Sequence, residues 1–219
     1  MKNKPDIIHW AENRGITQTA DYRILTSIPF VETSLDKADK LNLFRDTTIA
    51  PTKSIQIDQL SGVCHVIIPL VGGLDIVKNE TSLFIEPGQF YFDSSSEKQS
   101  FLIQNPYETE HINFLEVCFD CALENNLTTG NFNLDKNLNK LVELETFLSP
   151  KIYLGKFSAR KEFLINFEEK TKAYFFVVNG SFEANGMLLH NRDSASFVEV
   201  ESLDFESLGP ESIVVVIVE

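Results

Sequence analysis

The sequence holds few of the side chains from which metal and redox sites are built. Its 219 residues include four histidines and three cysteines, and no two histidines lie within five positions of each other. This spacing excludes the short histidine pairs that place two imidazoles side by side on one strand or helix. Three cysteines provide no framework of paired disulfides, which favours a reducing compartment.

Long apolar runs are also missing. The longest aliphatic run covers residues 213–218 and is far too short to cross a bilayer. Residues 1–15 contain neither an apolar core nor a cleavage pattern of small residues, so we expect no signal peptide. Together these absences predict a soluble, cytoplasmic protein.

Positive charge is scarce throughout the chain. The 19 lysines and arginines are outnumbered by 32 aspartates and glutamates, which gives a net charge of −13. Both halves are acidic, and an acidic surface repels phosphate backbones and anionic lipids. We therefore expect no direct nucleic-acid binding and no membrane binding, whereas a protein partner remains open.

The most informative feature that is present is a stretch that occurs twice. Residues 67–93 and residues 174–197 each contain an apolar run, a glycine (Gly72 or Gly180), apolar/polar alternation, a polar turn and a closing apolar residue. Alternation with period two is typical of a strand with one face on a core. One small β unit is therefore built twice.

Each copy predicts a hairpin followed by a corner. The second hairpin is four residues shorter and has Asn185-Gly186 at its tip, the strongest short-range hairpin signal because both turn residues need a positive φ. The corners are residues 86–89 and 190–193, and Arg192 stands in the second corner where Gly88 stands in the first.

Short strand signals separated by Gly, Pro, Asn and Ser run along most of the chain. This pattern predicts an all-β sandwich or barrel rather than a parallel α/β sheet. We expect a first domain over residues 1–120, a linker with a short helix over 121–145, and a second domain over 146–219. A single helical turn is expected at 34–39, and the non-alternating run 213–218 predicts a strand covered on both faces.

These residues resemble a known family, the pirin-like branch of the bicupins, which includes quercetin-dioxygenase-like proteins. The resemblance is carried by residues 11–15, by LVGGLDIV followed by FIEPGQF, and by IYLGKFSA, YFFVVNGSFEANGMLLHNRDSASFVEV and IVVVIV in the second half. It implies two tandem cupin-like antiparallel β-barrels of the jelly-roll type, over about residues 10–120 and 145–219.

The family resemblance implies one metal ion, often iron, in the first barrel. Its ligands are a His-x-His pair on one strand and a His and a Glu about 44 residues later, a set that suits Fe(II). Alignment places these four positions at Asp58, Leu60, Phe101 and Ile103. Because three of these side chains cannot bind a metal, the resemblance implies a degenerate site with no metal and no cofactor.

Two histidines remain as fallback ligands for iron or another divalent metal. His65 lies within a strand, but its odd spacing from Asp58 predicts that it faces away from the barrel interior. His111 begins a strand and is expected to face solvent. A dioxygenase with non-standard ligands would have to recruit these two histidines and Asp58.

Other candidate sites are weaker. Cys118 and Cys121 form a lone Cys-x-x-Cys at the end of a strand, where two unlinked thiols are favoured over a zinc or redox site. Cys64 is expected to be an ordinary packing residue within a strand. Asp58 with Glu116 or Asp75 would make an acid/base pair only if the fold brought them together.

The sequence therefore favours a metal-free, non-catalytic bicupin that binds a small apolar or aromatic molecule or a protein partner. The alternative is a metal-dependent dioxygenase of the quercetinase kind, and a third possibility is a purely structural interaction protein. Apolar replacements at the former metal site leave either a filled core or an apolar pocket. The side chains expected around it are Leu60, Phe101, Ile103, Phe90, Phe92 and Phe114.

Overall fold

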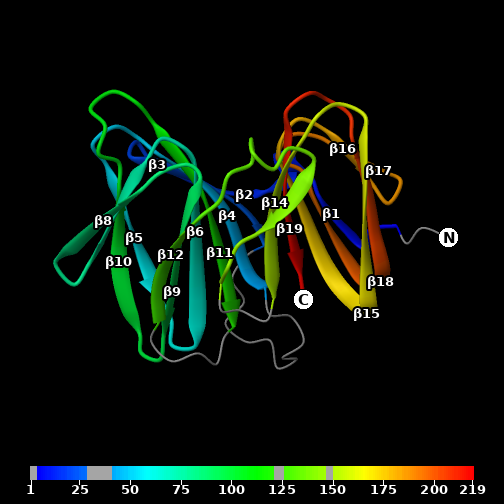
Figure 1. Ribbon diagram of the computed structural model, residues 1–219. Helices are drawn as coiled ribbons and strands as arrows, with labels where there is room; N and C mark the ends of the chain where they lie inside the picture. Colours follow the sequence, from blue (N-terminus) through cyan, green and yellow to red (C-terminus); the bar gives the residue numbers. More distant parts are fainter. Residues whose placement is uncertain (1–3, 29–40, 121–125, 147–149) are drawn as a thin grey trace. The chain divides into compact units, whose positions relative to one another are not determined.

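A computed structural model describes residues 4–28, 41–120, 126–146 and 150–219 (Figure 1). In these segments nearly all regular structure is strand, and the one helical element is the short 3-10 turn η1 (Ala11–Asn13). The described part of the chain contains no helix with the length and hydropathy needed to cross a membrane. The expected all-β bicupin architecture is confirmed, while the helical turn expected at 34–39 lies outside the described residues.

The chain forms two compact units whose boundaries differ from the expected ones. Residues 15–131 form one unit, here called the first barrel, and residues 132–219 together with 1–14 form the other, the second barrel. The expected linker is wrong in its described parts, because residues 126–131 and 140–143 are strands. The expected short helix is replaced there by turns and by a strand.

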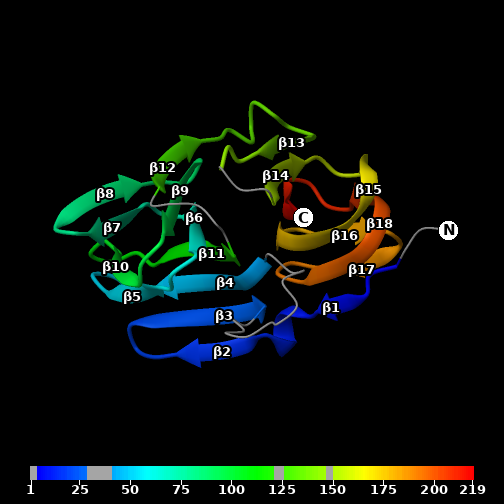
Figure 2. The same cartoon turned by 90° about the horizontal axis from the view of Figure 1, so that it is seen from below.

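The first barrel is built from two antiparallel sheets. A seven-stranded sheet has the order β12-β9-β6-β11-β4-β3-β2, and a four-stranded sheet has the order β5-β10-β7-β8. Figure 2 shows β4, β3 and β2 side by side. The strands are β2 (Gly15–Gln18), β3 (Tyr22–Ile28), β4 (Leu41–Ile49), β5 (Ser54–Gln59), β6 (Val63–Val71), β7 (Leu74–Lys78), β8 (Thr81–Ile85), β9 (Gln89–Ser95), β10 (Gln99–Gln104), β11 (Ile112–Asp120) and β12 (Asn126–Asn131).

The interior of the first barrel is an apolar core contributed by both sheets. Strand β5 shows the simplest pattern, because its residues alternate strictly between exposed and buried. Central strands β6 and β11 are buried on both faces along most of their length. The core consists of Ile24, Ile49, Ile55, Ile57, Ile67, Leu74, Ile76, Ile85, Tyr91, Phe101, Ile103, Ile112 and Phe114.

The second barrel is one continuous antiparallel sheet with the order β13-β14-β19-β15-β18-β16-β17, and β1 pairs with β18. The strand predicted at residues 213–218 lies in the middle, between β14 and β15, as its lack of alternation indicated. The strands are β1 (Ile7–His9), β13 (Lys140–Glu143), β14 (Lys151–Phe157), β15 (Lys161–Asn179), β16 (Phe182–Ala184), β17 (Met187–Leu189), β18 (Ser194–Ser207) and β19 (Ser212–Val218).

Phenylalanine fills the core of the second barrel. Phe205 lies against four other rings at centroid distances of 5.3–5.9 Å, three of them tilted or edge-on. Such offset and edge-on pairs are favourable beyond the area that they bury. The rings are Phe157, Phe163, Phe175, Phe182 and Phe205.

The two barrels contain the same repeated unit. In the first, β6 and β9 pair and enclose the hairpin β7-β8, and in the second β15 and β18 pair and are joined by the hairpin β16-β17. The corners use the same hydrogen bond: the Gln89 side chain accepts from Glu86 N–H at 3.1 Å, and the Asp193 side chain accepts from His190 N–H at 2.9 Å. The duplication inferred from the sequence is therefore structural.

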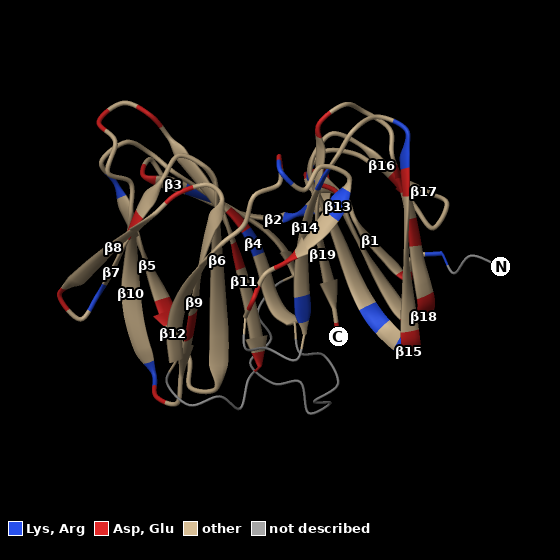
Figure 3. Ribbon diagram, viewed as in Figure 1, with Lys and Arg blue, Asp and Glu red and all other residues tan. Residues whose placement is uncertain are grey.

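Acidic and basic residues are intermixed along the strands and loops of both units (Figure 3). In the first barrel, the charged residues that the structure buries are few: Asp46, Asp93 and Glu116, with His65 as a buried titratable neighbour. A buried carboxylate requires a partner because burial penalises its charge. These buried groups, rather than the acidic surface, are where a functional site is expected.

Candidate functional site

Strands β5 and β10 occupy the place to which the family resemblance assigns a metal. The side chains that point into the barrel there include Ile57 and Gln59 on β5 and Phe101 and Ile103 on β10. Asp58, to which the alignment assigned a ligand position, therefore does not point into the barrel. A shift of one residue along a strand moves a side chain to the opposite face. Asp58 lies on the exposed face of β5, where it accepts a hydrogen bond from Gln56 at 2.9 Å.

The side chains at this place do not fit the family's metal. Gln59 is the one polar group among the four, and its amide is already satisfied by the protein. It donates to the carbonyl oxygens of Val63 and Asp93, both at 3.2 Å, and accepts from the Gln99 side chain at 2.9 Å. With no imidazole or carboxylate among Ile57, Gln59, Phe101 and Ile103, this face of the barrel cannot supply the ligand set of the family.

A different group of ligand-type side chains lies on the opposite sheet. Glu116 and Cys118 are two residues apart on β11 and so share one face of that strand. His65 on β6 is the direct cross-strand neighbour of Cys118, and Arg45 on β4 is the cross-strand neighbour of Glu116. The antiparallel register of three adjacent strands thus brings four polar side chains together.

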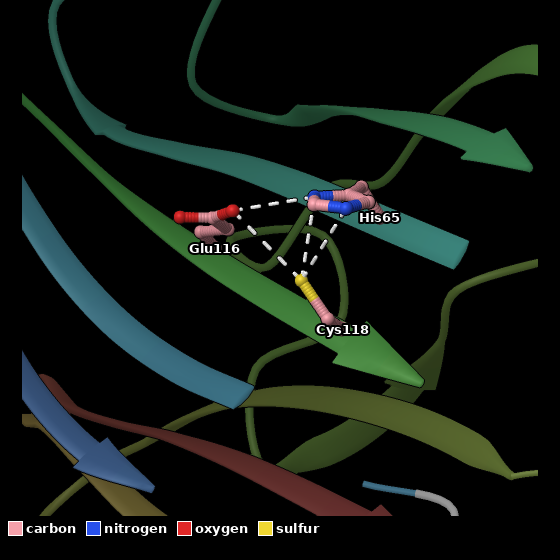
Figure 4. Close-up of side chains that lie close together, drawn as sticks. All are labelled: His65, Glu116 and Cys118. Carbon is pink, nitrogen blue, oxygen red and sulfur yellow. Dashed lines mark hydrogen bonds and ion pairs between the residues drawn. The ribbon is translucent and has the colours of Figure 1, made fainter. Parts of the chain in front are cut away.

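Three of these side chains converge closely, as Figure 4 shows. His65 Nδ1 lies 3.2 Å from Glu116 Oε1 and 3.3 Å from Cys118 Sγ. The thiol donates weakly to the same carboxylate oxygen at 3.8 Å. The other oxygen, Glu116 Oε2, accepts from Arg45 Nη1 at 3.5 Å. The carboxylate therefore has one oxygen in the cluster and one on the guanidinium.

Burial and charge act on the cluster in opposite directions. Burial by itself raises the pKa of the Glu116 carboxyl, but the hydrogen bond and charge of His65, and then those of Arg45, hold that pKa below its usual range. Burial, followed by the neighbouring Glu116 carboxylate, raises the pKa of the Cys118 thiol well above its usual value. The cluster thus holds an ionised carboxylate and a protonated thiol.

The cluster borders a cavity of about 460 Å³ in the first barrel. The lining combines the polar cluster with aliphatic side chains and with residues of the edge strand β5. It is made by Tyr22, Ile24, Leu43, Arg45, Ile55, Gln56, Ile57, Asp58, Leu60, Val63, Lys98, His65, Glu116 and Cys118. The space is therefore open, but it is amphipathic rather than purely apolar.

Several residues expected around the cavity lie elsewhere. Phe101, Ile103 and Phe114 belong to the filled apolar core. Phe90 and Phe92 are buried on β9 and are not part of the described lining. Among the expected pocket residues, the described lining contains Leu60 and Asp58. A filled core and a cavity, expected as alternatives, are therefore both present, and Ile24, Ile55 and Ile57 belong to both.

His65 was expected to face outward, and that prediction is wrong. Its ring is buried and meets the ring of Phe101 edge-on at a centroid distance of 5.8 Å. The error has the same origin as that of Asp58, because the outward direction was counted from a residue that itself faces outward. Counted from an outward-facing Asp58, the same odd spacing correctly places His65 inward.

The other expected ligands do not join the cluster. His111 is exposed, precedes β11, and borders a separate depression with Tyr22 and Arg23. Cys118 is a free, buried thiol, and Cys121 lies outside the described residues. Cys64 is disulfide-bonded, so the expectation of a plain packing thiol is wrong.

Sequence reasoning weighed Glu116 only as an acid/base partner of Asp58 and missed its place beside His65 and Cys118. The usable signal was the Glu-x-Cys spacing, which places both side chains on one face of a strand. The missing part was the register of β6 against β11, which no local pattern specifies.

Comparison with known proteins supports the fold. A family model described as the quercetinase C-terminal cupin domain matches residues 149–217, whereas comparison with curated proteins finds no significant match. YhhW from Escherichia coli superposes with a TM-score of 0.84 at 11% identity, over 96% of each chain. The bacterial pirin YhhW in complex with nickel(II), from Escherichia coli, gives 0.83 at 10% identity, over 96% of this chain and 97% of that one.

Quercetin 2,3-dioxygenase from Acinetobacter baumannii gives a TM-score of 0.77 at 10% identity, over 98% of this chain and 86% of that one. At sequence identities of 10–11%, structural similarity to these proteins establishes a shared fold and nothing beyond it. The chain therefore has the two-barrel fold of these proteins. Within the second barrel, residues 149–217 match the quercetinase C-terminal cupin domain.

Proposed function

We propose that the protein binds a small molecule in the cavity of the first barrel and does not catalyse the dioxygenation of its quercetinase-like relatives. The observation that carries this proposal is the cavity of about 460 Å³, which is within the size range of small-molecule sites. The family's metal position supports the non-catalytic part, because Ile57, Gln59, Phe101 and Ile103 face the interior there.

The lining favours a ligand with an apolar or aromatic body and one acceptor group. Aliphatic side chains such as Ile24, Leu43 and Ile57 provide the surface for the body. Arg45 provides the polar contact, because its Nε is buried and makes no hydrogen bond to any described residue. A buried donor without a partner is costly, so a ligand oxygen at this position would gain its full hydrogen bond.

The alternative function, a metal-dependent dioxygenase using His65, His111 and Asp58, has less support. His111 and Asp58 are both exposed, and neither belongs to the group of potential ligands formed around His65. A protein partner, which the sequence also leaves open, gains no specific support from the cavity.

The test is saturable binding of a small aromatic probe to chelator-treated protein. We expect the flavonol quercetin or benzoate to bind with measurable heat and to raise the melting temperature. Leu60→Trp, which places a large ring in the lining, should weaken binding by roughly tenfold or more. Ile16→Trp, at an exposed position on β2, is the matched control and should bind normally.

Three results would overturn the proposal. The first is binding that Leu60→Trp leaves unchanged, and the second is the absence of binding by any aromatic probe. The third is oxygen uptake with quercetin by protein loaded with iron, nickel or manganese, which would establish the dioxygenase instead.

A further inference from the structure

We propose that His65, Glu116 and Cys118 form a binding site for a divalent ion of the zinc type on the floor of the same cavity. This site uses other residues and other strands than the metal position of the family, which it adjoins through Phe101. It is built by β6 and β11 in the seven-stranded sheet, whereas the family's position corresponds to β5 and β10 in the four-stranded sheet.

The three atoms have the spacing of a tetrahedral face. His65 Nδ1, Glu116 Oε1 and Cys118 Sγ are separated by 3.2, 3.3 and 3.8 Å. Zinc bonds of about 2.0–2.3 Å at tetrahedral angles place neighbouring ligand atoms roughly 3.3–3.6 Å apart. An ion near the middle of this triangle would lie about 2.0–2.3 Å from all three atoms, and no backbone shift is required.

The ligands are held in place before an ion arrives. Their backbones belong to paired strands in the centre of a sheet, and all three side chains are buried. Arg45 engages Glu116 Oε2 and so leaves Oε1 directed to the cluster. Phe101 packs edge-on against the His65 ring. Neighbours that orient the ligands in this way commonly contribute to metal affinity.

The ligand types select the class of ion. A thiolate with an imidazole and one carboxylate suits zinc and its spectroscopic substitute cobalt(II). Magnesium and calcium prefer six or more oxygen ligands, so they are excluded from this site by chemistry. On binding, the ion takes the place of the thiol proton, which passes to solvent.

The position of the cluster leaves a coordination site open. All three residues border the cavity, so a fourth ligand would come from the water or small molecule that the cavity holds. Three protein ligands with one open position are typical of zinc sites that bind substrates, whereas structural zinc sites are closed by four. The proposal goes beyond ligand binding, which does not itself require the ion.

The competing interpretation is a closed polar network in which the three groups only satisfy one another. Cobalt(II) titration of chelator-treated protein distinguishes the two, because thiolate coordination gives an intense near-ultraviolet charge-transfer band and a tetrahedral site gives strong visible bands. We expect about one equivalent to bind, with zinc displacing it and magnesium having no effect.

Variants locate the site. Cys118→Ser should abolish the charge-transfer band, and Glu116→Gln should weaken cobalt binding by roughly tenfold to a hundredfold. His111→Gln, at the exposed histidine outside the cluster, is the matched control and should leave the spectrum unchanged. Circular dichroism of each variant checks that it folds.

A second measurement covers the case in which Cys118→Ser does not fold. X-ray absorption of the wild-type zinc protein should show one sulfur at about 2.3 Å among nitrogen and oxygen ligands. A spectrum with no sulfur, or a cobalt titration without the charge-transfer band, would show a hydrogen-bonded cluster only. A band that survives Cys118→Ser would show that cobalt binds to a different thiolate and would equally overturn the proposed site. Quercetin binding to chelator-treated protein is measured separately, so either proposal can fail while the other stands.

Discussion

Gly88 and Arg192 occupy the same place in the two copies of the repeated unit, and both have a left-handed backbone, with φ of 94° and 69°. Each precedes the residue whose side chain caps the corner, Gln89 in one copy and Asp193 in the other. The corner therefore requires this backbone whatever the side chain. Glycine adopts it without strain, whereas arginine does so at a cost of about 1 kcal/mol or more.

The first prediction is that Arg192→Gly stabilises the second barrel relative to Arg192→Ala by about 1 kcal/mol. Alanine is the proper reference, because both variants lose the arginine side chain and only glycine relieves the backbone. Urea unfolding followed by the fluorescence of Trp10, the single tryptophan and part of the same unit, measures the difference. In the first barrel, Gly88→Ala should lower the free energy of unfolding by a similar amount.

An alanine variant at Arg192 as stable as the glycine variant would contradict this prediction. It would mean that the left-handed backbone at the second corner carries no conformational strain.

The second prediction concerns pH. Because the pKa of Glu116 is lowered in the folded protein, this carboxylate adds stability that is fully present above its ordinary pKa and is lost as the pH falls toward the folded-state value. Glu116→Gln should therefore reduce the free energy of unfolding at neutral pH by about 3 kcal/mol, since it leaves His65 and Arg45 without their buried partner. The loss should shrink under acid conditions.

Chemical unfolding followed by far-ultraviolet circular dichroism at neutral and at acid pH makes the comparison. Glu110→Gln, an exposed carboxylate in the same barrel, is the control and should cost less than about 0.5 kcal/mol. An equal loss at both pH values would show that Glu116 contributes through packing and not through its charge.

Much of the fold was predictable because it rests on local patterns. The strand at residues 212–218 contains the whole of the non-alternating run 213–218 from which it was predicted. Asn185 and Gly186 both have positive φ, at 45° and 81°, as the hairpin signal requires. The repeat predicted two similar units because each copy carries its own turn chemistry.

Two long strands, β15 and β18, are irregular along their length. In β15 the register shifts around Thr171, and in β18 Glu199 has a φ of 52°, but neither irregularity ends its strand. The outer strands β12 and β13 lie where a linker was expected, because an edge strand needs little apolar pattern of its own and is specified by the strand it pairs with. For the same reason the two compact units have other bounds than the expected domains.

The candidate site was least predictable. His65, Glu116 and Cys118 were all in view, but their meeting depends on which strands are neighbours and in which register. A one-residue error at Asp58 was enough to turn His65 outward in the prediction. The chemistry of each side chain can be taken from the sequence. Which side chains of different strands meet can be known only from the order and register of the strands in the sheet.

The third prediction separates two glycines that share a positive φ. At Gly186 a Cβ would meet nothing within 4 Å, so Gly186→Ala should cost only the backbone strain, about 1 kcal/mol. At Gly180 a Cβ would lie 2.3 Å from Ser212 Oγ and 3.0 Å from its Cα, so Gly180→Ala adds a collision and should cost at least about twice as much.

Urea unfolding followed by Trp10 fluorescence ranks the two variants. Equal costs would indicate that Ser212 moves aside freely and that the glycine is required for its backbone conformation alone.

The fourth prediction concerns the aromatic core. Phe205 contacts the rings of Phe157, Phe163, Phe175 and Phe182, and it is 1% exposed. Phe205→Ala would leave a cavity among rigid rings that cannot collapse into it, so it should lower the free energy of unfolding of the second barrel by about 3–5 kcal/mol. Leu164→Ala, at a position 54% exposed, is the control and should cost less than about 0.5 kcal/mol.

Binding of a small apolar probe to Phe205→Ala then shows whether the cavity left by the ring stays open. Benzene should stabilise Phe205→Ala and leave the wild-type protein unchanged, because a dry apolar cavity accepts such a molecule. A loss near 1 kcal/mol, with no effect of benzene, would mean that the surrounding rings repack. The phenylalanine core would then be able to rearrange, and the rigidity of the second barrel would have to come from its strand pairing.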